Sequence, residues 1–375
     1  MDFDFSEDQE ALRDAVRRFV DKDYTFDRRT KIQRAGGFDS GVWDGLAGLG
    51  LTALAVPEAH GGLGFGAVEA MVVMEELGRG LVMEPLAQGA LIAPAVLRHA
   101  PDDLQAAWLP RIAGGEALVV LAHQEGRSRY RLNQVATRAV DGKLTGVKSL
   151  VPAGDRVDAF IVPARVAGTD DAPHGVALYL VEREAAGVHT RPYALFDGSR
   201  AAEVHFDNTP AQLIAGPDQG LMLLELAADI GIAAQAAEAV GVMEKYLALT
   251  VEYMNTRKQF GVAISSFQAL RHRAADVKMQ LELARSMSYY ATLRLGDVPA
   301  VRRRALSQAK VQLGQAMRFV GQQCTQLHGG IGVTDEYAGS HYFKRLTVME
   351  MQWGDTLHHL GEVSQRMQDT AGVFA

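Results

Sequence analysis

The sequence has little of three things that mark whole classes of protein: cysteine, excess positive charge and long apolar runs. A single cysteine, Cys324, excludes an internal disulfide framework and a metal site built from several cysteines. The formal net charge of −7 lacks the basic field that non-specific nucleic-acid binding needs. No uninterrupted apolar run approaches eighteen residues, and no basic flank leads into an apolar stretch at the amino terminus. These absences predict a cytoplasmic protein that binds neither nucleic acid nor membrane.

What is present is enough apolar material for a large core. Hydrophobic residues make up 48% of the 375 residues, and charged residues make up 22%. A chain of this length and composition exceeds one compact helical unit and predicts two or three domains.

Periodicity divides the chain into three stretches. Apolar spacings of three and four predict helices at residues 7–21, 40–49, 67–77, 87–97 and 102–112. A period of two predicts short strands at 116–123, 135–140, 159–164, 175–181 and 202–206. Long helical periodicity returns at 226–255, 266–293, 301–325 and 361–371. The order predicts a mostly α fold with a central β domain: an N-terminal helical domain (1–115), a middle antiparallel β-barrel or sandwich (116–220) and a C-terminal four-helix bundle (221–375).

Two motifs in the last third of the chain point to a bound dinucleotide. The run Gln326-Leu-His-Gly-Gly330 places two adjacent glycines where a backbone can approach a bulky ligand. Upstream, Arg257 offers a planar, permanently charged fork suited to phosphate. Taken singly, a Gly-Gly pair is more often a helix C-cap, and an exposed arginine is more often solvated. Together the motifs suggest a flavin dinucleotide site.

These motifs, with Phe267-Gln268 between them and the segments 1–9 and 56–64, resemble the acyl-CoA dehydrogenase family over nearly the whole chain. The resemblance implies FAD as cofactor. It also implies that the arginine and the Gly-Gly turn come from a neighbouring subunit and hold the pyrophosphate and adenosine half of FAD, so at least a dimer is expected. The candidate cofactor contacts are Arg257, Phe260, Gln268, Gln326, Leu327, Gly329, Gly330 and Thr356.

The reaction that the resemblance implies is α,β-dehydrogenation of an acyl-CoA thioester, with electrons passed to an electron-transfer flavoprotein. An α-proton is weakly acidic, so a carboxylate base in a dry pocket is required. Family members carry a glutamate at one of two places. The place on the first bundle helix falls on or near Gly231, which has no side chain, and the nearest carboxylates, Asp229 and Glu238, do not match it.

The second place for the base lies in residues 352–360, where the register is ambiguous. Matching Thr356 to the family threonine puts Gly354 on the base, whereas matching His359 and Leu360 to the family's acidic-plus-isoleucine pair puts Asp355 there. We take Asp355 as the candidate base, with a helix N-terminal acid as the alternative. His358 and His359 would lie nearby, either tuning the base or serving as polar packing.

The β region departs from the family at the flavin and thioester contacts. Residues 124–130 replace the usual Thr-Glu-Pro and Gly-Ser-Asp, and Leu150-Val-Pro152 replaces Trp-Ile-Thr. Ser128, Tyr130 and Tyr253 are candidate substrate contacts, with core or turn roles as the alternative. Local arginines, either Arg127, Arg129 and Arg131 or Arg271 and Arg273, could meet the phosphates of coenzyme A.

The variations also resemble the small-subunit type of pimeloyl-CoA dehydrogenase, which is associated with a larger homologous subunit. The expected assembly is therefore a homodimer, a homotetramer or a hetero-tetramer. A rival interpretation is a catalytically silent subunit that lends Arg257, Gln326 and the Gly329-Gly330 turn to a partner's FAD. A flavin oxidase or monooxygenase on the same fold is a third interpretation.

Overall fold

The computed structural model describes residues 4–365 and 367, and its contacts divide the chain into two compact units. We call Met1–Arg29, Met71–Val82 and Ile232–Ala375 the helical unit, and Thr30–Ala70 and Met83–Gly231 the sheet unit. Element type changes from helix to strand between Ala113 and Val119 and back to helix between Ala215 and Gly220. The contacts therefore group the chain into two units, whereas the sequence predicts three domains.

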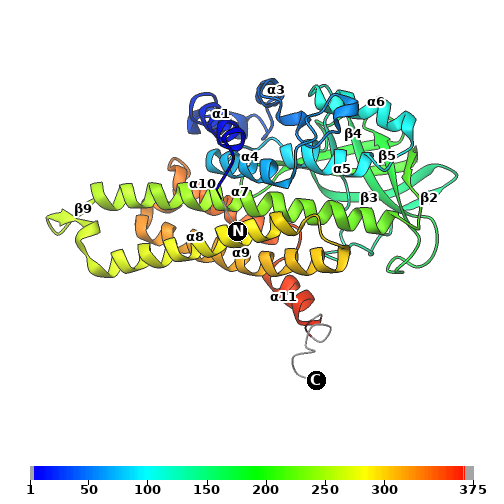
Figure 1. The fold of residues 1–375 in the computed structure, drawn as a ribbon. Helices are drawn as coiled ribbons and strands as arrows, with labels where there is room; N and C mark the ends of the chain where they lie inside the picture. The colour runs from blue at the N-terminus through cyan, green and yellow to red at the C-terminus, as the bar shows by residue number, and fades with distance from the viewer. Residues whose placement is uncertain (1–3, 366, 368–375) are drawn as a thin grey trace. The chain divides into compact units, whose positions relative to one another are not determined.

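The helical unit is built on long helices that share one core (Figure 1). Its elements include α1 (Glu7–Asp23), α4 (Ala67–Gly80) and α7 (Gly220–Thr256), the last two of which begin in the sheet unit. They also include β9 (Lys258–Gln259), β10 (Val262–Ala263), α8 (Gln268–Arg294), α9 (Pro299–His328), α10 (Ala338–Met351) and α11 (Thr356–Gln365). Val240 of α7, Leu281 of α8, Leu313 of α9 and Leu346 of α10 are all buried in the same cluster. The predicted C-terminal helical bundle is confirmed, because apolar residues at helical spacing bury one stripe of each helix.

Helix α7 is long and apolar enough to cross a membrane by length and composition, with a mean hydropathy of 1.4 over its most apolar window. In the structure 72% of that window is buried. The apolar character of α7 is therefore used in the protein core.

Local capping explains where several helices begin. The Ser6 hydroxyl accepts a hydrogen bond from the backbone N–H of Gln9, and the Gln9 side chain accepts one from the backbone N–H of Ser6. This reciprocal pair starts α1. Asp39 caps α3 (Ser40–Gly48) by accepting from the backbone N–H groups of Gly41 and Val42.

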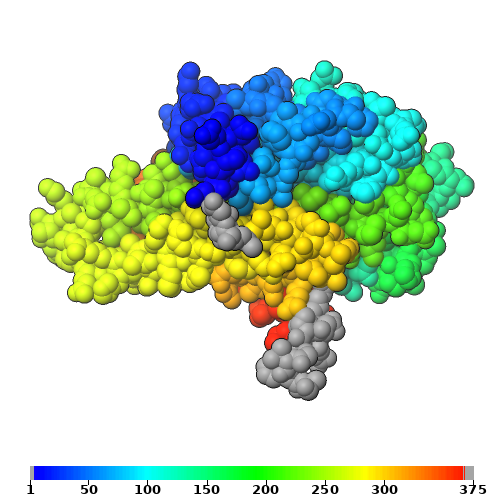
Figure 2. Space-filling model, in the orientation of Figure 1, coloured from blue at the N-terminus to red at the C-terminus, as the bar shows by residue number. Residues whose placement is uncertain are grey.

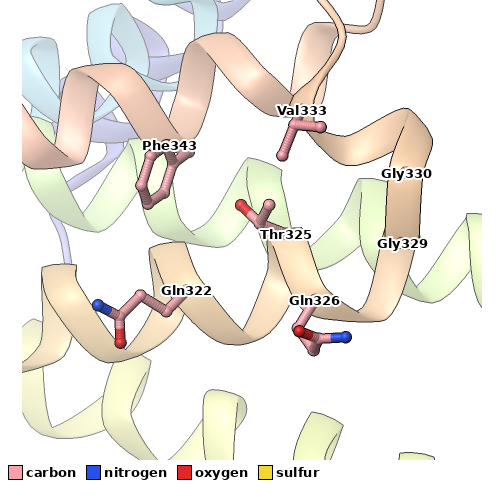
Figure 3. Close-up of a pocket in the computed structure, with 7 residues that line it drawn as sticks. All are labelled: Gln322, Thr325, Gln326, Gly329, Gly330, Val333 and Phe343. Atoms are coloured by element: carbon pink, nitrogen blue, oxygen red, sulfur yellow. The ribbon is translucent and has the colours of Figure 1, made fainter.

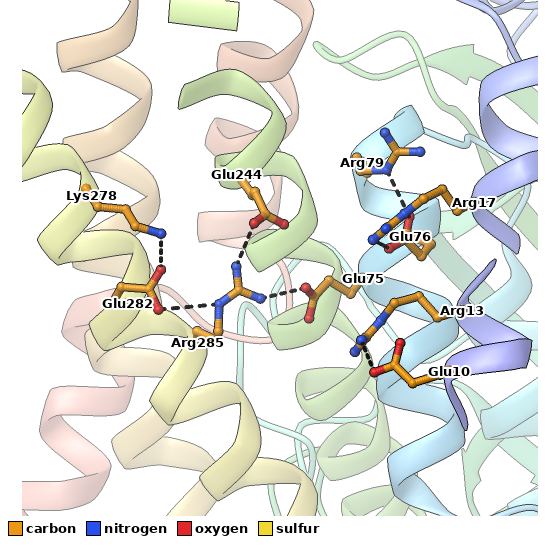
Figure 4. A network of polar contacts seen from close by, with 10 residues as sticks. All are labelled: Glu10, Arg13, Arg17, Glu75, Glu76, Arg79, Glu244, Lys278, Glu282 and Arg285. Atoms are coloured by element: carbon orange, nitrogen blue, oxygen red, sulfur yellow. Dashed lines mark hydrogen bonds and ion pairs between the residues drawn. The ribbon is translucent and has the colours of Figure 1, made fainter. Parts of the chain in front are cut away.

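Ion pairs join α1, α4, α7 and α8 within the helical unit (Figure 4). The Arg285 guanidinium lies 2.6 Å from Glu75, 3.1 Å from Glu244 and 3.5 Å from Glu282. Glu76 accepts hydrogen bonds from both Arg17 and Arg79. Burial raises the pKa of Glu75 despite the opposing charge of Arg285, so this network depends on each cation remaining in place.

The sheet unit carries one eight-stranded sheet with short helices. Its helical elements are α2 (Phe26–Arg34, which begins in the helical unit), α3, η1 (Leu51–Ala53), η2 (Glu58–His60), η3 (Ala87–Ile92), α5 (Ala93–Leu97) and α6 (Asp102–Ala113). Its strands are β1 (Val119–Leu121), β2 (Arg138–Val140), β3 (Lys143–Pro152), β4 (Ala159–Arg165), β5 (Val176–Glu182), β6 (Val188–Ala194), β7 (Arg200–Pro210) and β8 (Gln212–Ala215). The strand order is β6-β7-β3-β2-β4-β5-β8, and β1 pairs with β4.

The sheet is mixed rather than purely antiparallel, which corrects one detail of the expected middle domain. Strand β4 runs parallel to β1, with Val119 opposite Ala159, and parallel to β2, with Arg138 opposite Arg165. Parallel neighbours need a long connection, and the chain between β1 and β4 supplies one. Strands β6 and β8 stand at the two ends of the order, so the pairing of the described strands gives an open sheet rather than a closed barrel.

Several elements were not expected from periodicity: α2, β3, β6, β8 and α10. Strand β3 lies between β2 and β7 but carries lysines and glycine, and its register shifts between Lys148 and Val151, so strict alternation is broken. Helix α11 begins at Thr356, five residues before the predicted 361–371, and the end of that predicted helix lies outside the described residues.

Candidate functional site

The predicted Gly-Gly turn lies at the end of α9 and lines a surface hollow of about 490 Å³ (Figure 3). Helix α9 ends at His328, and the 3₁₀ turn η5 follows at Gly329–Val333. The lining residues are Gln322, Thr325, Gln326, Gly329, Gly330, Val333 and Phe343. Sequence reasoning missed Gln322 and Thr325, although their helical spacing from Gln326 places all three on one face of α9.

The two glycines of this turn present open backbone. Gly329 has φ of +65°, a conformation that favours glycine. Gly330 has no such φ, and a Cβ built on either residue would meet no atom of the described residues within 4 Å, its own chain neighbours aside. Packing within the chain therefore does not explain Gly330. The backbone of Gly329 and Gly330 is exposed where it lines the hollow.

The structure brings the Arg257 segment to this turn. Met254 of α7, Ile264 after the β9–β10 hairpin, and Leu327 of α9 form one small hydrophobic cluster. The rings of Tyr253 and His328 also lie 4.8 Å apart. Two motifs about seventy residues apart thus share one core.

Arg257 itself is exposed just beyond α7 and forms no ion pair with the described residues. The hairpin that follows it is at the surface, at the yellow-green end of the helical unit in Figure 2. Its Phe260 is 92% exposed with φ of +52°, and its ring lies edge-on to Phe267 at 6.2 Å. Gln268, at the start of α8, is exposed beside His272. A cation and an aromatic ring held out in this way fit contact with a second molecule.

The candidate base, Asp355, caps a helix. Its Oδ1 accepts a hydrogen bond from the backbone N–H of His358 at 2.8 Å, so Asp355 is the N-cap of α11. Thr356, the first residue of α11, donates from its N–H and its hydroxyl to Glu350, with distances of 3.1 and 2.7 Å. The structure thus gives both predicted residues a local role at the start of α11.

The residue before the cap, Gly354, has no room for a side chain. Its φ is +112°, and a Cβ there would lie 2.5 Å from Nε2 of His359 and 2.6 Å from Cδ2 of His358. Trp353 before it also has a positive φ, of +61°. The alternative base register therefore falls on a glycine that the turn requires.

Hydrogen bonds of the His359 side chain connect this turn to α9. Its Nε2 donates to the Trp353 carbonyl at 2.9 Å, so its Nδ1 accepts from the Ser307 hydroxyl at 3.2 Å. Burial, reinforced by the charge of Lys310, lowers the pKa of His359 to about 3. Lys310 donates to the carbonyl oxygens of Met349 and Glu350 at 2.7 and 3.2 Å, and burial lowers its pKa to about 7. His359 is therefore neutral and held in one tautomer.

The carboxylates near the other base position are buried. Asp229 is 2% exposed. Glu238 is 7% exposed and accepts from Arg345 at 2.5 and 2.7 Å. Gly231 lies within α7. The ion pair with Arg345 gives Glu238 a structural role in the helical unit.

In the sheet unit, the predicted substrate contacts lie on a loop anchored by a buried ion pair. Glu125 lies 2.6 Å from Lys148 and also accepts from Ala136 and Thr137. Burial raises the pKa of Glu125, but the lysine charge and these hydrogen bonds together hold it below its ordinary value. The Ser128 hydroxyl donates to the Glu125 carbonyl, so Ser128 closes the turn.

The other two predicted substrate contacts have different surroundings. Tyr130 is partly exposed, and the guanidinium of Arg129 lies 5.4 Å from its ring. Tyr253 packs beside His328 in the helical unit, beneath the Gly-Gly turn. Leu150, in the segment that replaces the family's Trp-Ile-Thr, is 46% exposed with φ of +55°, and its N–H donates to the Tyr193 hydroxyl. Among the described residues no cluster of three or more His, Cys, Asp or Glu side chains could hold a metal ion.

Comparison with known proteins identifies the family. The N-terminal and C-terminal domain models of acyl-CoA dehydrogenases match residues 6–116 and 218–368. Acyl-CoA dehydrogenase FadE27 of Mycobacterium tuberculosis is 27% identical over 382 residues, which cover 99% of this chain and 100% of that protein.

Solved structures give the same result. A variant of the Tcur3481-Tcur3483 steroid ACAD is 26% identical, covers 97% of this chain and 99% of its own, and has a TM-score of 0.88. A glutaryl-coenzyme A dehydrogenase in complex with glutaryl-CoA is 22% identical, covers 98% and 97%, and has a TM-score of 0.90, which shows the fold. The chain therefore belongs to the acyl-CoA dehydrogenase family of FAD-dependent oxidoreductases that act on CH–CH bonds.

Proposed function

We propose that this chain dehydrogenates an acyl-CoA thioester to the trans-2-enoyl-CoA and passes the electrons to an electron-transfer flavoprotein. The observation that best supports this proposal is the hollow at Gln326, Gly329 and Gly330, joined through a shared core to the segment that carries Arg257. The proposal places the protein in fatty acid metabolism, in the cytoplasm.

The residues around the hollow fit the phosphate-bearing half of FAD. The open backbone of Gly329 and Gly330 admits close approach, and the exposed guanidinium of Arg257 supplies positive charge. Gln326, at the rim, supplies an amide that can donate and accept (Figure 3). We propose that these residues serve FAD shared with a neighbouring subunit, with Phe260, Gln268 and Leu327 completing the surface. Bound FAD would supply the acceptor for the β-hydride.

The α-proton needs a base, and we propose Asp355 for this role. It is a carboxylate in the segment where family members carry one of their glutamates. Acting as a base would require Asp355 to combine proton transfer with its cap on α11. We propose Thr356 beside it as a cofactor contact. Ser128, Tyr130 and Tyr253, each taken by itself, are the proposed substrate contacts.

A catalytically silent subunit is the second candidate, and three observations support proposing it. Gly354 has no room for a glutamate, Gly231 has no side chain, and Glu238 is paired with Arg345. In this alternative the chain lends Arg257, Gln326 and the Gly-Gly turn to the FAD of a larger homologous subunit, as in the small-subunit type of pimeloyl-CoA dehydrogenase.

The test is the visible spectrum of the purified protein, followed by anaerobic addition of a panel of acyl-CoA thioesters. Wild type is compared with Asp355→Asn and with Glu238→Gln. Asparagine caps a helix as well as aspartate does, so Asp355→Asn removes the carboxylate while keeping α11. We expect flavin bleaching in wild type and in Glu238→Gln, and its loss in Asp355→Asn.

Other outcomes separate the candidates. Undiminished bleaching in Asp355→Asn would remove Asp355 as the base. Colourless protein that gains flavin only when a larger homologous subunit is added would favour the silent subunit. Native mass spectrometry of the purified assembly distinguishes a homodimer or homotetramer from a hetero-tetramer.

A further inference from the structure

His328, the residue before the glycine turn, is held by two hydrogen bonds although it does not line the hollow. It is 3% exposed. Its Nδ1 lies 2.8 Å from the Cys324 carbonyl oxygen, which can only accept, so Nδ1 carries the proton. In the neutral ring Nε2 then accepts from the Tyr337 hydroxyl, 2.9 Å away. Burial lowers the pKa of His328, which favours this neutral form.

Three tyrosine rings surround the imidazole. Tyr246 stacks on it at 5.9 Å with an interplanar angle of 16°. Tyr253 lies at 4.8 Å and Tyr337 at 5.0 Å, both tilted. Tyr246 and Tyr253 come from α7, and Tyr337 directly precedes α10. We call His328 and these three tyrosines the box; it joins α7, the end of α9 and the residue before α10. Its contacts leave the His328 ring one orientation.

Gly332, later in the same turn, also packs against His328. A Cβ on Gly332 would lie 2.8 Å from the Thr325 carbonyl oxygen and 2.9 Å from Cβ of His328. Gly332 is therefore required by packing, unlike Gly329 and Gly330, which face open space. The buried His328 thus packs against one side of the turn, while the backbone of Gly329 and Gly330 on its other side is exposed.

We propose that His328 and Tyr337 are positioning residues that fix the Gly329-Gly330 backbone in the geometry that receives the phosphates of FAD. The inference rests on the proposed function of this hollow. The side chains of His328 and Tyr337 do not line the hollow, so their effect on the ligand passes through the backbone between them.

The test uses three single variants of the purified assembly, together with the double variant of Tyr337→Phe and His328→Asn. Tyr337→Phe removes the hydroxyl and keeps the ring. His328→Asn keeps a donor near the Cys324 carbonyl and removes the acceptor for Tyr337. Tyr342→Phe is the matched control, because Tyr342 is a buried tyrosine of the same unit whose hydroxyl donates to the Arg79 carbonyl and not to His328.

Three quantities are measured for each variant: the dissociation constant for FAD, the thermal midpoint, and amide hydrogen exchange at residues 329–333 without added FAD. We expect Tyr337→Phe and His328→Asn each to weaken FAD binding by about tenfold and to speed exchange at 329–333 by a similar factor, since each loses a buried hydrogen bond. The double variant should be little worse than either single variant, because both remove one interaction. Tyr342→Phe should lower the thermal midpoint alone.

Each contrary result has a distinct meaning. A lower midpoint with unchanged FAD affinity and unchanged exchange at 329–333 would reduce His328 and Tyr337 to a structural role and overturn the inference. Wild type that binds no FAD, alone or with a homologous subunit, would overturn the proposed function of the hollow. In that case the exchange data still decide whether the box holds the turn: equal exchange in Tyr337→Phe and wild type would refute it.

Discussion

Gly354 and His359 exclude any side chain at one of the two positions that fit the family's catalytic glutamate. A Cβ on Gly354 would lie 2.5 Å from Nε2 of His359, and that nitrogen is held in place by its hydrogen bond to the Trp353 carbonyl. The φ of +112° at Gly354 adds a backbone conformation that residues with a Cβ rarely adopt. The turn before α11 is therefore built for glycine.

Replacing Gly354 by alanine should destabilise the protein. We expect the free energy of unfolding to fall by about 2–4 kcal/mol, because the methyl group meets both histidine rings and the positive φ is strained. Urea unfolding measures the change. Gly361→Ala on α11 is the matched control, since its Cβ would meet none of the described residues within 4 Å apart from its own helix backbone, and it should leave stability equal or slightly higher. Equal stability of Gly354→Ala and wild type would contradict the tight turn.

Replacing Gly330 by alanine should leave stability nearly unchanged but weaken FAD binding. The chain has open space at this position and no positive φ, so the free energy of unfolding should change by less than about 0.5 kcal/mol. FAD binding should weaken by about tenfold or more, because the new methyl group would occupy the space that the ligand approaches. Flavin fluorescence titration measures the affinity. Unchanged affinity would show that no ligand comes close to this backbone.

Removing Arg285 should weaken the helical unit, because its guanidinium serves Glu75, Glu244 and Glu282 together (Figure 4). Arg285→Met leaves the largely buried Glu75 without its cation, and we expect a loss of about 2–4 kcal/mol in unfolding free energy. The matched control is Arg294→Met on the same helix, whose more exposed arginine pairs with nearby Asp297, so this variant should leave the thermal midpoint nearly unchanged. Similar thermal midpoints for the two variants would refute a special role for Arg285.

Stability should fall as the pH drops below the ordinary pKa of histidine, in part through His359. Burial holds the folded-state pKa of His359 at about 3, whereas an unfolded histidine titrates near 6.5. Between these values the unfolded chain binds a proton that the folded chain does not. The contribution of His359 is therefore complete above about pH 6.5 and is lost as the pH falls toward 3.

The variant His359→Asn isolates this effect. Urea unfolding between pH 4 and 6 should show a slope of stability with pH that is smaller than in wild type by up to about 1.4 kcal/mol per pH unit, the value for one proton. His189→Asn, at an exposed position on β6, provides the comparison. Parallel pH profiles for wild type and His359→Asn would mean that His359 is already protonated in the folded state or does not titrate on unfolding.

The predicted cofactor surface and the predicted base depend on motifs of different clarity. Gln326, Gly329, Gly330 and Arg257 belong to motifs whose residue types carry the chemistry themselves, and the structure gathers their segments around one small core. For Asp355 the motif was ambiguous by one residue. One register puts the base on Asp355, which caps α11, and the other puts it on Gly354, which needs a positive φ. A short motif does not predict such backbone conformations.

By itself the sequence determined the family, the change from helix to strand and back, and the apolar stripes that bury α7 to α10, because these depend on periodicity and on local residue types. Only the tertiary structure decided the mixed order of the sheet, the place of β3 within it, and the contacts around His328 and His359. These features join residues far apart in the chain, such as Tyr253 with His328 and Ser307 with His359. Contacts of this kind follow from the packing of whole helices and strands, which no local pattern encodes.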